Sequence, residues 1–438
     1  TALITIFFAM EPTAFIIFLY LFNKTMSTNI SPFSKPKYVM LKPAGAACNM
    51  RCDYCYYLEK KNLYQQQRRQ ILSEDMLEKF VEQYMNIQTT PSVLFTWHGG
   101  EPLMRPITFY QKALELQKKY ANGRQIDNAI QTNGTLITDE WARFFRKNNF
   151  LVGVSIDGPE EMHNAYRLTQ QGKPSWQQVM RGIRTLNRHN VEWNAMATVN
   201  NLNADSPEAF YHFFKEINCH FIQFTPVVER LYRHQDGRTL ASPIDGAWAE
   251  LAPFSVTPKQ WGNFLCRLFD EWVREDVGNY FIQMFDSTLA GWMDMEPSVC
   301  SLAKTCGHAA VMEANGDIYV CDHYVFPQFK LGNIAEHTLT ELMYSAAQND
   351  FGQNKEKLLT TQCRQCDYLF ACHGECPRNR FSISADGQKG HNYLCQGYYR
   401  FFKHVSRYMD YMKYQLQHEQ APANIMEWIK SGEPEYRH

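Results

Sequence analysis

The first half of the chain alternates short apolar runs with longer segments whose apolar residues recur at helical spacing. Runs of four to eight apolar residues predict strands, and spacing of i, i+3, i+4, i+7 predicts amphipathic helices. The predicted strands cover residues 38–41, 93–97, 126–131, 151–156, 192–199 and 221–225. One helix is predicted after Ser73 as its N-cap, with Leu77, Phe80, Val81 and Tyr84 on one face. The other helices are predicted over residues 108–120, 139–147, 176–188 and 207–217.

This order of elements predicts an α/β fold with a parallel sheet. Strands in series that are joined through helices pair in parallel, with right-handed crossovers. We therefore expect a partial (β/α)6 barrel over residues 37–228. Because catalytic groups in such folds lie at the carboxyl ends of the strands, the residues after each strand are the first candidates for chemistry.

The regions outside the barrel differ in composition. Residues 231–253 are polar and irregular, and Thr257-Pro258 is typical of a helix start. A strand is predicted over residues 280–285 and a core-facing helix over residues 398–416. The expected divisions are an N-terminal extension (1–36), the barrel (37–228), a bridging region (229–299), a cysteine-rich domain (300–397) and a C-terminal helix and tail (398–438).

Two apolar runs, at residues 3–10 and 13–22, precede the first strand and are separated by Glu11 and Pro12. Neither run reaches the length of a bilayer span, and the basic segment of a signal peptide is missing. We expect residues 1–25 to lie outside the working protein, with a membrane-associating segment as the alternative. No membrane partner is expected.

Eleven of the thirteen cysteines fall into two clusters. Cys48, Cys52 and Cys55 follow the first predicted strand. The later cluster consists of Cys300, Cys306, Cys321, Cys363, Cys366, Cys372, Cys376 and Cys395. Three thiolates leave one iron of a 4Fe-4S cluster open to a ligand, and eight thiolates can complete two further clusters. The pattern therefore predicts three 4Fe-4S clusters, of which one is open.

Disulfides and zinc are the alternative explanations. Disulfide frameworks are typical of short secreted domains, whereas 438 residues with 45% hydrophobic content can bury a large core. The pair Cys363-x2-Cys366 alone would suit zinc, but Cys48, Cys52 and Cys55 have no fourth thiol nearby. Iron is therefore favoured, and Cys219 and Cys266 are expected to be buried small hydrophobic residues.

The overall charge gives no sign of a nucleic-acid partner. The formal net charge is −1, and the sequence has no polybasic run. The reduced thiolates that iron clusters need fit a reducing, cytoplasmic compartment.

Two motifs resemble the radical S-adenosylmethionine (SAM) superfamily. The segment from Cys48 to Cys55, with Tyr54 before its last cysteine, resembles the cluster-binding loop of these enzymes. Gly99-Gly100-Glu101-Pro102 is similar to the GGEP element that meets the amino group of SAM. Each motif alone is modest evidence, but together, at the ends of successive strands, they are specific.

The later cysteines resemble the SPASM extension, which holds two auxiliary 4Fe-4S clusters. The runs at residues 131–135 (QTNGT), 155–159 (SIDGP) and 321–324 (CDHY) are similar to anaerobic sulfatase-maturating enzymes, and the resemblance extends from Tyr38 to about Tyr411. It implies a first auxiliary set of Cys300, Cys306, Cys321 and Cys376 and a second auxiliary set of Cys363, Cys366, Cys372 and Cys395. The place of Cys376 is implied by the resemblance and not by spacing.

The resemblance also implies how SAM is bound. SAM would bind the open iron and give a 5′-deoxyadenosyl radical. The expected contacts are Tyr54, Gly99, Gly100, Glu101 and Ser155, with Arg167 as a candidate for the SAM carboxylate. Taken alone, Ser155 and Arg167 fit equally well as a strand-end hydroxyl and a surface cation.

The substrate implied by the resemblance is a sulfatase polypeptide with a Cys/Ser-x-Pro-x-Arg motif, whose Cys or Ser is oxidised to Cα-formylglycine. Asp322 would be the base that takes the thiol or hydroxyl proton, although an Asp after a Cys is more often a turn residue. Tyr57 is expected to line the peptide pocket, with ordinary aromatic packing as the alternative.

His98 departs from the pattern of the family, in which many members carry Gln before the GGEP element. We expect His98 to donate a hydrogen bond to peptide or SAM, and its protonation to make activity more sensitive to pH. Its effect on the preference between Cys and Ser substrates stays open.

An electron donor such as ferredoxin or flavodoxin is a further implied partner. Two alternative functions remain. One is a SPASM maturase that crosslinks a ribosomal peptide. Such maturases often carry a peptide-recognition domain before the barrel, and the 37 residues before Tyr38 make this alternative less favoured. The other is a non-enzymatic electron-transfer protein, which would need neither an open iron nor a GGEP turn.

Overall fold

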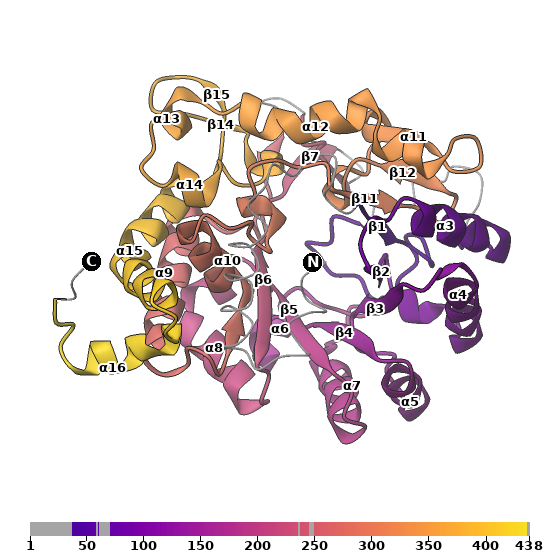
Figure 1. Ribbon diagram of the computed structural model, residues 1–438, viewed down its shortest axis with the longest axis horizontal. Helices are drawn as coiled ribbons and strands as arrows, with labels where there is room; N and C mark the ends of the chain where they lie inside the picture. The colour runs from indigo at the N-terminus through magenta and orange to yellow at the C-terminus, as the bar shows by residue number, and fades with distance from the viewer. Residues whose placement is uncertain (1–36, 58–59, 61–70, 235–236, 245–248, 436–438) are drawn as a thin grey trace.

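The computed structural model describes residues 37–57, 60, 71–234, 237–244 and 249–435 (Figure 1). The predictions for the N-terminal extension concern residues outside this part of the chain. Among the described helices, none combines the length and the apolar character that a membrane crossing requires.

Six parallel strands form the centre of the fold, and each predicted strand is confirmed to within one residue at either end. They are β1 (Tyr38–Leu41), β2 (Ser92–Trp97), β3 (Gln125–Thr132), β4 (Phe150–Ser155), β5 (Trp193–Val199) and β6 (Phe221–Pro226). Neighbours in this order pair in parallel. The predicted α/β class with a curled parallel sheet is therefore correct.

Helices cover the outer side of these strands (Figure 1). They are α3 (Glu74–Asn86), α4 (Ile107–Tyr120), α5 (Asp139–Lys147), α6 (Glu160–Asn164), α7 (Trp176–Arg188) and α8 (Pro207–Glu216). The sequence shows where they begin, because Ser73 accepts a hydrogen bond from the backbone N–H of Met76, and Thr138 accepts one from that of Trp141. Only the short α6 was not predicted.

The cysteine-rich region extends the same sheet. β11 (Ala309–Met312) pairs in parallel with β1, and β12 (Asp317–Tyr319) and β13 (Lys330–Asn333) follow it as antiparallel strands. On the opposite edge, β10 (Phe281–Ile282) pairs in parallel with β6. Because β11 lies beside β1, the cysteine-rich region joins the sheet directly at the first strand of the barrel.

Two predictions for the bridging region are wrong. The strand expected over 280–285 ends at Ile282, and α10 (Gln283–Trp292) follows at once. Helical spacing buries Phe285, Leu289 and Trp292, so packing of this face decides the conformation. The segment expected to be irregular contains a small antiparallel sheet of β7 (Arg230–His234), β8 (Gly237–Leu240) and β9 (Glu250–Leu251).

Two long helices close the molecule. α9 (Pro258–Glu275) begins with a capping box between Thr257 and Gln260 and packs along α15 (Cys395–Gln417), so both predicted helices are confirmed. A Cβ atom on Gly262 would lie 2.9 Å from the Cα atom of Gly397, which explains glycine at this helix crossing. The remaining elements are α11 (Leu339–Met343), α12 (Ala346–Lys357), α13 (Thr361–Arg364), α14 (Leu369–Cys372), β14 (Ser382–Ile383), β15 (Lys389–His391) and α16 (Ile425–Lys430).

Candidate functional site

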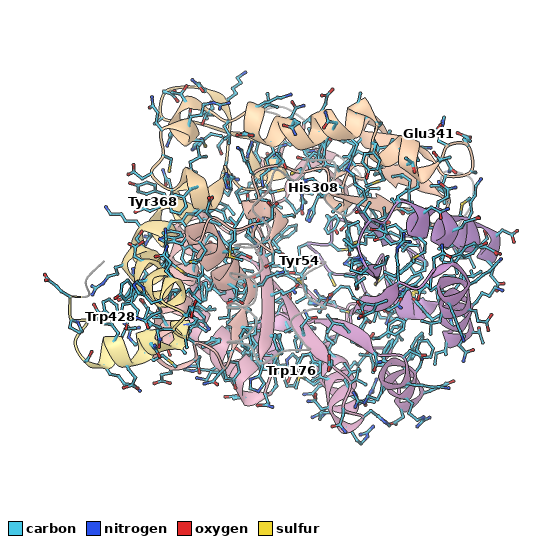
Figure 2. All side chains as sticks on the ribbon, viewed as in Figure 1. Tyr54, Trp176, His308, Glu341, Tyr368 and Trp428 are labelled. Atoms are coloured by element: carbon cyan, nitrogen blue, oxygen red, sulfur yellow. The ribbon has the colours of Figure 1, made fainter. Side chains whose placement is uncertain are left out.

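The loop with the first three cysteines follows β1 and is held by backbone hydrogen bonds. The N–H groups of Arg51 and Asp53 donate to the carbonyl oxygens of Leu168 and Tyr166, at 2.8 and 3.0 Å. Tyr54, on the same loop, lies near the centre of the molecule (Figure 2).

The three thiols of this loop act on one another. Burial raises the pKa of Cys48, and Cys55 raises it further. Burial also raises the pKa of Cys52, where Cys55 and Cys48 add to the rise and Arg167 opposes it. The structure therefore brings Cys48, Cys52 and Cys55 together.

The Gly-Gly turn after β2 packs closely against the backbone at the start of this loop. Gly100 donates its N–H to the carbonyl oxygen of Gly45 at 2.9 Å, and a Cβ atom on Gly100 would lie 2.1 Å from the oxygen of Ala47. Gly99 adopts a φ of +128°, which side chains other than glycine rarely allow. The two glycines thus permit the close approach that sets the position of the cysteine loop.

Glu101 is fully buried, with its carboxylate fixed by three donors. Its Oε1 accepts from the Leu103 N–H at 2.9 Å and the Thr132 hydroxyl at 2.7 Å, and its Oε2 accepts from the Asn133 N–H at 2.7 Å. Burial raises the pKa of Glu101 to about 7. Glu101 also raises the pKa of Cys48, so the carboxylate lies near the cysteine loop. An ammonium group bound here would keep the carboxylate ionised.

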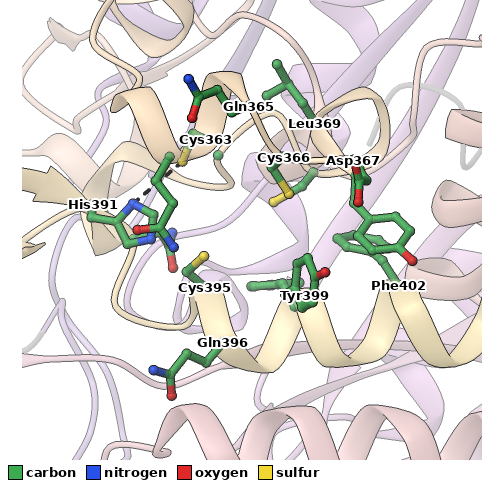
Figure 3. A pocket seen from close by; sticks show the side chains of 16 residues that line it. Cys363, Gln365, Cys366, Asp367, Leu369, His391, Cys395, Gln396, Tyr399 and Phe402 are labelled. Atoms are coloured by element: carbon green, nitrogen blue, oxygen red, sulfur yellow. Dashed lines mark hydrogen bonds between the residues drawn. The ribbon is translucent and has the colours of Figure 1, made fainter. Parts of the chain in front are cut away.

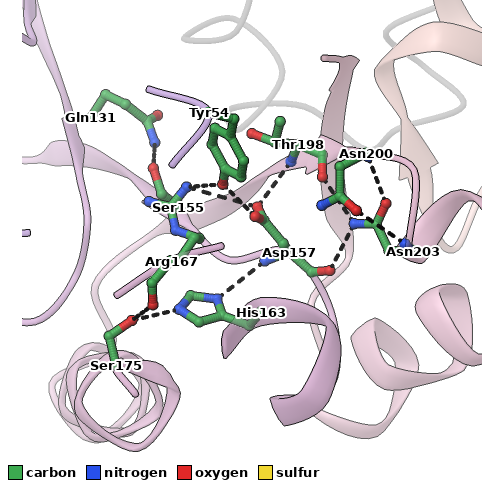
Figure 4. A network of polar contacts seen from close by, with 10 residues as sticks. All are labelled: Tyr54, Gln131, Ser155, Asp157, His163, Arg167, Ser175, Thr198, Asn200 and Asn203. Atoms are coloured by element: carbon green, nitrogen blue, oxygen red, sulfur yellow. Dashed lines mark hydrogen bonds and ion pairs between the residues drawn. The ribbon is translucent and has the colours of Figure 1, made fainter. Parts of the chain in front are cut away.

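Tyr54 and Arg167 belong to one buried network (Figure 4). The Tyr54 hydroxyl donates to Asp157 Oδ2, and Arg167 Nη1 donates to the Tyr54 oxygen at 2.8 Å. Arg167 Nη1 also lies 3.8 Å from Asp157 Oδ1. Arg167 is only 7% exposed, which rules out a surface cation, and its buried Nε has no hydrogen-bond partner among the described residues. Ser155, at the edge of this network, accepts from Gln131 Nε2 at 3.0 Å.

Asp157 was not singled out from the sequence, although it lies within the SIDGP run. Its role is visible only after folding, because its partners come from the cysteine loop and from the segment after α6.

Asp322 belongs to the cysteine-rich region and contacts the residue that follows β1. Lys42, the residue after β1, is fully buried and places its Nζ 2.5 Å from Asp322 Oδ1. The Tyr56 hydroxyl donates to Asp322 Oδ2. Burial alone would raise the pKa of Asp322, but Lys42, His98 and His323 outweigh it and hold that pKa well below its usual range. Lys42 and Tyr56 were missed from the sequence; a lysine at the very end of a buried strand was the available signal.

His98 also contacts Lys42, with 3.1 Å between Nζ and His98 Nδ1. Burial and the Lys42 cation lower the pKa of His98 to about 3. The lowered pKa favours the neutral ring, which counts against the expected pH sensitivity from protonation of His98.

Tyr57 lies beneath the same group, with the Lys42 ammonium 4.5 Å from the centre of its ring. It is 4% exposed, and its hydroxyl donates to Glu313 just after β11. This arrangement fits the packing alternative for Tyr57, while its neighbour Tyr56 is the tyrosine that reaches Asp322.

The structure brings the four thiols of the first auxiliary set together. Burial raises the pKa of Cys321, and Cys300 and Cys376 raise it further. Burial likewise raises the pKa of Cys376, and Glu375, Cys306 and Cys300 raise it further. Cys376 thus lies with the first set, although it follows the second-set residue Cys372 by four positions.

The second auxiliary set lines a cavity of about 500 Å³ between α13, α14 and the start of α15 (Figure 3). Burial raises the pKa of Cys372, where Cys395 and Cys363 add to the rise, and burial, Cys363 and Cys366 raise that of Cys395. His391 Nδ1 lies 3.6 Å from Cys363 Sγ. The cavity therefore presents four thiols to one enclosed volume.

These thiol groups fit iron clusters better than single zinc ions. Within the described residues, no three His, Cys, Asp or Glu side chains converge closely enough to hold one metal ion. A zinc site needs its ligands about 2 Å from one ion, whereas each thiolate of a 4Fe-4S cluster binds a different iron. Cys219 and Cys266 are buried, as expected of small hydrophobic residues.

Comparison with known proteins agrees with this arrangement. Residues 43–214 match the Radical SAM superfamily, and residues 300–367 match SPASM, an iron-sulfur cluster-binding domain. A serine-type anaerobic sulfatase-maturating enzyme of Bacteroides thetaiotaomicron is 63% identical over 93% of this chain and 98% of its own length. A cysteine-type anaerobic sulfatase-maturating enzyme of Clostridium novyi is 33% identical over 84% of this chain and 95% of its own.

A solved structure is similar over most of the molecule. Native anSMEcpe with bound AdoMet and Cp18Cys peptide is 31% identical, with a TM-score of 0.76, over 86% of this chain and 99% of that one. From its sequence, fold and thiol groups together, the chain belongs to the anaerobic sulfatase-maturating enzymes, which are radical SAM enzymes with a SPASM domain.

Proposed function

We propose that this enzyme oxidises a serine in a Ser-x-Pro-x-Arg motif of a sulfatase polypeptide to Cα-formylglycine. The observation that carries the chemistry is the position of Asp322, which directly follows a first-set cysteine and yet forms an ion pair with Lys42 at the end of β1. A base at this place can face a peptide held between the barrel and the cysteine-rich region. Serine is preferred over cysteine in this proposal because of the 63% identity to a serine-type relative.

Each thiol group has a proposed role. Cys48, Cys52 and Cys55 hold the cluster that binds SAM, and the first and second auxiliary sets each hold one further 4Fe-4S cluster. When bound, SAM and the clusters supply a 5′-deoxyadenosyl radical that removes a Cβ hydrogen and an acceptor for the second electron.

The residues around Glu101 orient SAM. The buried Glu101 carboxylate, fixed after Gly99 and Gly100, accepts from the SAM ammonium group. Arg167 has a buried Nε without a hydrogen-bond partner among the described residues, which can donate to the SAM carboxylate, and Ser155, at the end of β4, offers a hydroxyl. Tyr54, held by Asp157, fixes the shape of this pocket.

Asp322 takes the hydroxyl proton of the target residue. Lys42 and Tyr56 hold its two oxygens in place and keep it ionised at neutral pH. A carboxylate stabilised in this way is a weak base, so alignment with the hydroxyl contributes more to the proton transfer than basicity does.

The remaining assignments concern partners and location. A ferredoxin or flavodoxin supplies electrons, and the enzyme works in the cytoplasm, where thiolates remain reduced. Nucleic acid has no part in the reaction, in line with the net charge of −1.

The test is an anaerobic reaction of the reconstituted protein with SAM, a reductant and two peptides that differ only in Ser or Cys at the target position. We expect a loss of about 2 Da from the Ser peptide, with 5′-deoxyadenosine formed alongside. Formation of 5′-deoxyadenosine with both peptides unchanged would contradict the proposal and favour a crosslinking maturase. Faster conversion of the Cys peptide would overturn the serine preference alone.

A further inference from the structure

His98 Nδ1 meets two groups that can only donate hydrogen bonds. The Lys42 ammonium lies 3.1 Å from this nitrogen, and the backbone N–H of Gly99 donates to it at 2.7 Å. Neither group has an acceptor atom, so Nδ1 must be the unprotonated nitrogen of the ring. The proton of the neutral imidazole is therefore on Nε2.

The Nε2–H group is free to bind a ligand. Within the described part of the chain, Nε2 has no hydrogen-bond partner, and the side chain keeps partial exposure while its Nδ1 edge faces Lys42. His98 follows β2 directly, at the carboxyl end of the sheet, where the chemistry of such folds takes place.

One ammonium joins this donor to the proposed base. Lys42 Nζ contacts Asp322 Oδ1 at 2.5 Å on one side and His98 Nδ1 at 3.1 Å on the other. The acceptor carboxylate and the ring that carries the donor N–H thus contact the same fully buried ammonium. A hydroxyl group suits this pair, because it can donate to Asp322 and accept from His98 at the same time.

We propose that His98 is the residue that determines the preference for serine, by donating its Nε2–H to the oxygen of the target side chain. The inference rests on the proposed function. As the O–H bond breaks, the proton passes to Asp322, and the oxygen keeps its hydrogen bond from His98, which neither gains nor loses a proton. A thiol sulfur is a weak acceptor, so a cysteine substrate gains little from the same donor. Lys42 is a positioning residue that fixes the donor nitrogen.

The test compares His98→Phe and His98→Gln with the unchanged enzyme on matched Ser and Cys peptides, and records kcat/KM for formylglycine by mass spectrometry. We expect His98→Phe to lower the value for the Ser peptide by roughly tenfold to a hundredfold and that for the Cys peptide by less than about threefold. His98→Gln retains an N–H donor and should recover part of the Ser activity. His189→Phe, a change at a surface ion pair with Asp139, is the control.

The ratio of the two peptides separates this role from a structural one. Incomplete folding or cluster loading lowers both rates by the same factor and leaves the ratio unchanged. An equal fall for both peptides in His98→Phe would overturn the inference while leaving the proposed function intact. Failure of the unchanged enzyme to convert the Ser peptide would instead count against the proposed function itself.

Discussion

The two auxiliary cysteine sets have different surroundings. Beside the first set, Lys355 is fully buried and donates to the carbonyl oxygens of Cys300 and Ser301 at 2.9 and 2.7 Å. Burial raises the pKa of Cys306, and Lys355 and Arg380 oppose that rise. Two cations, Lys355 and Arg380, therefore act on the first set.

The second set has acidic neighbours and lines the cavity described above. Burial raises the pKa of Cys366, with a further contribution from Asp367, and Glu375 contributes to that of Cys372. Glu375 acts on Cys376 of the first set as well, so it does not distinguish the two. Buried cations favour a reduced cluster, and only the first set also adjoins Asp322. The two sets, built from the same ligands, are therefore suited to different steps, and the first set is the one next to the proposed base Asp322.

The largest effect on the rate is expected from the aspartates that directly follow a cysteine, Asp322 in the first set and Asp367 in the second. Asp322→Asn removes the proposed base, so we expect formylglycine formation to fall by about 10²-fold to 10⁴-fold while 5′-deoxyadenosine is still produced. Asp367→Asn, the matched change after Cys366, should alter the rate far less. The assay is mass spectrometry of peptide and nucleoside in one reaction, and similar losses in both variants would remove the functional distinction between the sets.

A smaller effect concerns the buried cation. Lys355→Met removes a positive charge beside the first set, so adding an electron there becomes less favourable and the reduction potential should fall by on the order of 60 mV. The potential of the second cluster should not change. Lys357→Met, at an exposed position of the same helix, is the control. Redox titration followed by EPR measures the potentials of both auxiliary clusters. A shift confined to the second cluster would contradict the placement of Lys355 beside the first set.

The smallest effect is expected in the second set. His391→Leu removes the contact between Nδ1 and Cys363 Sγ, and loss of this polar neighbour of a ligand sulfur should lower the potential by on the order of 30 mV. The first cluster should keep its potential, and the exposed His418→Leu serves as the control. The same redox titration measures this effect. An unchanged reduction potential of the second cluster would mean that His391 only packs against the thiol.

The barrel was predictable because its signals are local. Strand and helix ends follow from apolar spacing and from caps such as Ser73, and these agree with the structure. The error at 280–285 arose because Phe281 and Ile282 do form a strand, while Phe285 is drawn into a helical face that packs against Phe269 and Phe401.

The site was predictable only where motifs carried it. Cysteine spacing pointed to iron, and the glycines at 99 and 100 pointed to a turn after β2. The contact of Lys42 with Asp322 spans 280 positions and depends on β11 pairing with β1, which no local pattern indicates. Spacing alone would also have placed Cys376 with Cys372, whereas the fold turns it toward Cys306.

The most direct test of the thiol grouping is the EPR spectrum of the dithionite-reduced Cys376→Ala variant, compared with those of Cys321→Ala and Cys395→Ala. The two reference variants each lose one auxiliary cluster, the first and the second respectively, and about four of about twelve iron atoms. We predict that the Cys376→Ala spectrum matches that of Cys321→Ala. A match to Cys395→Ala would contradict the grouping of the thiols and, with it, the proposed division of work between the two sets.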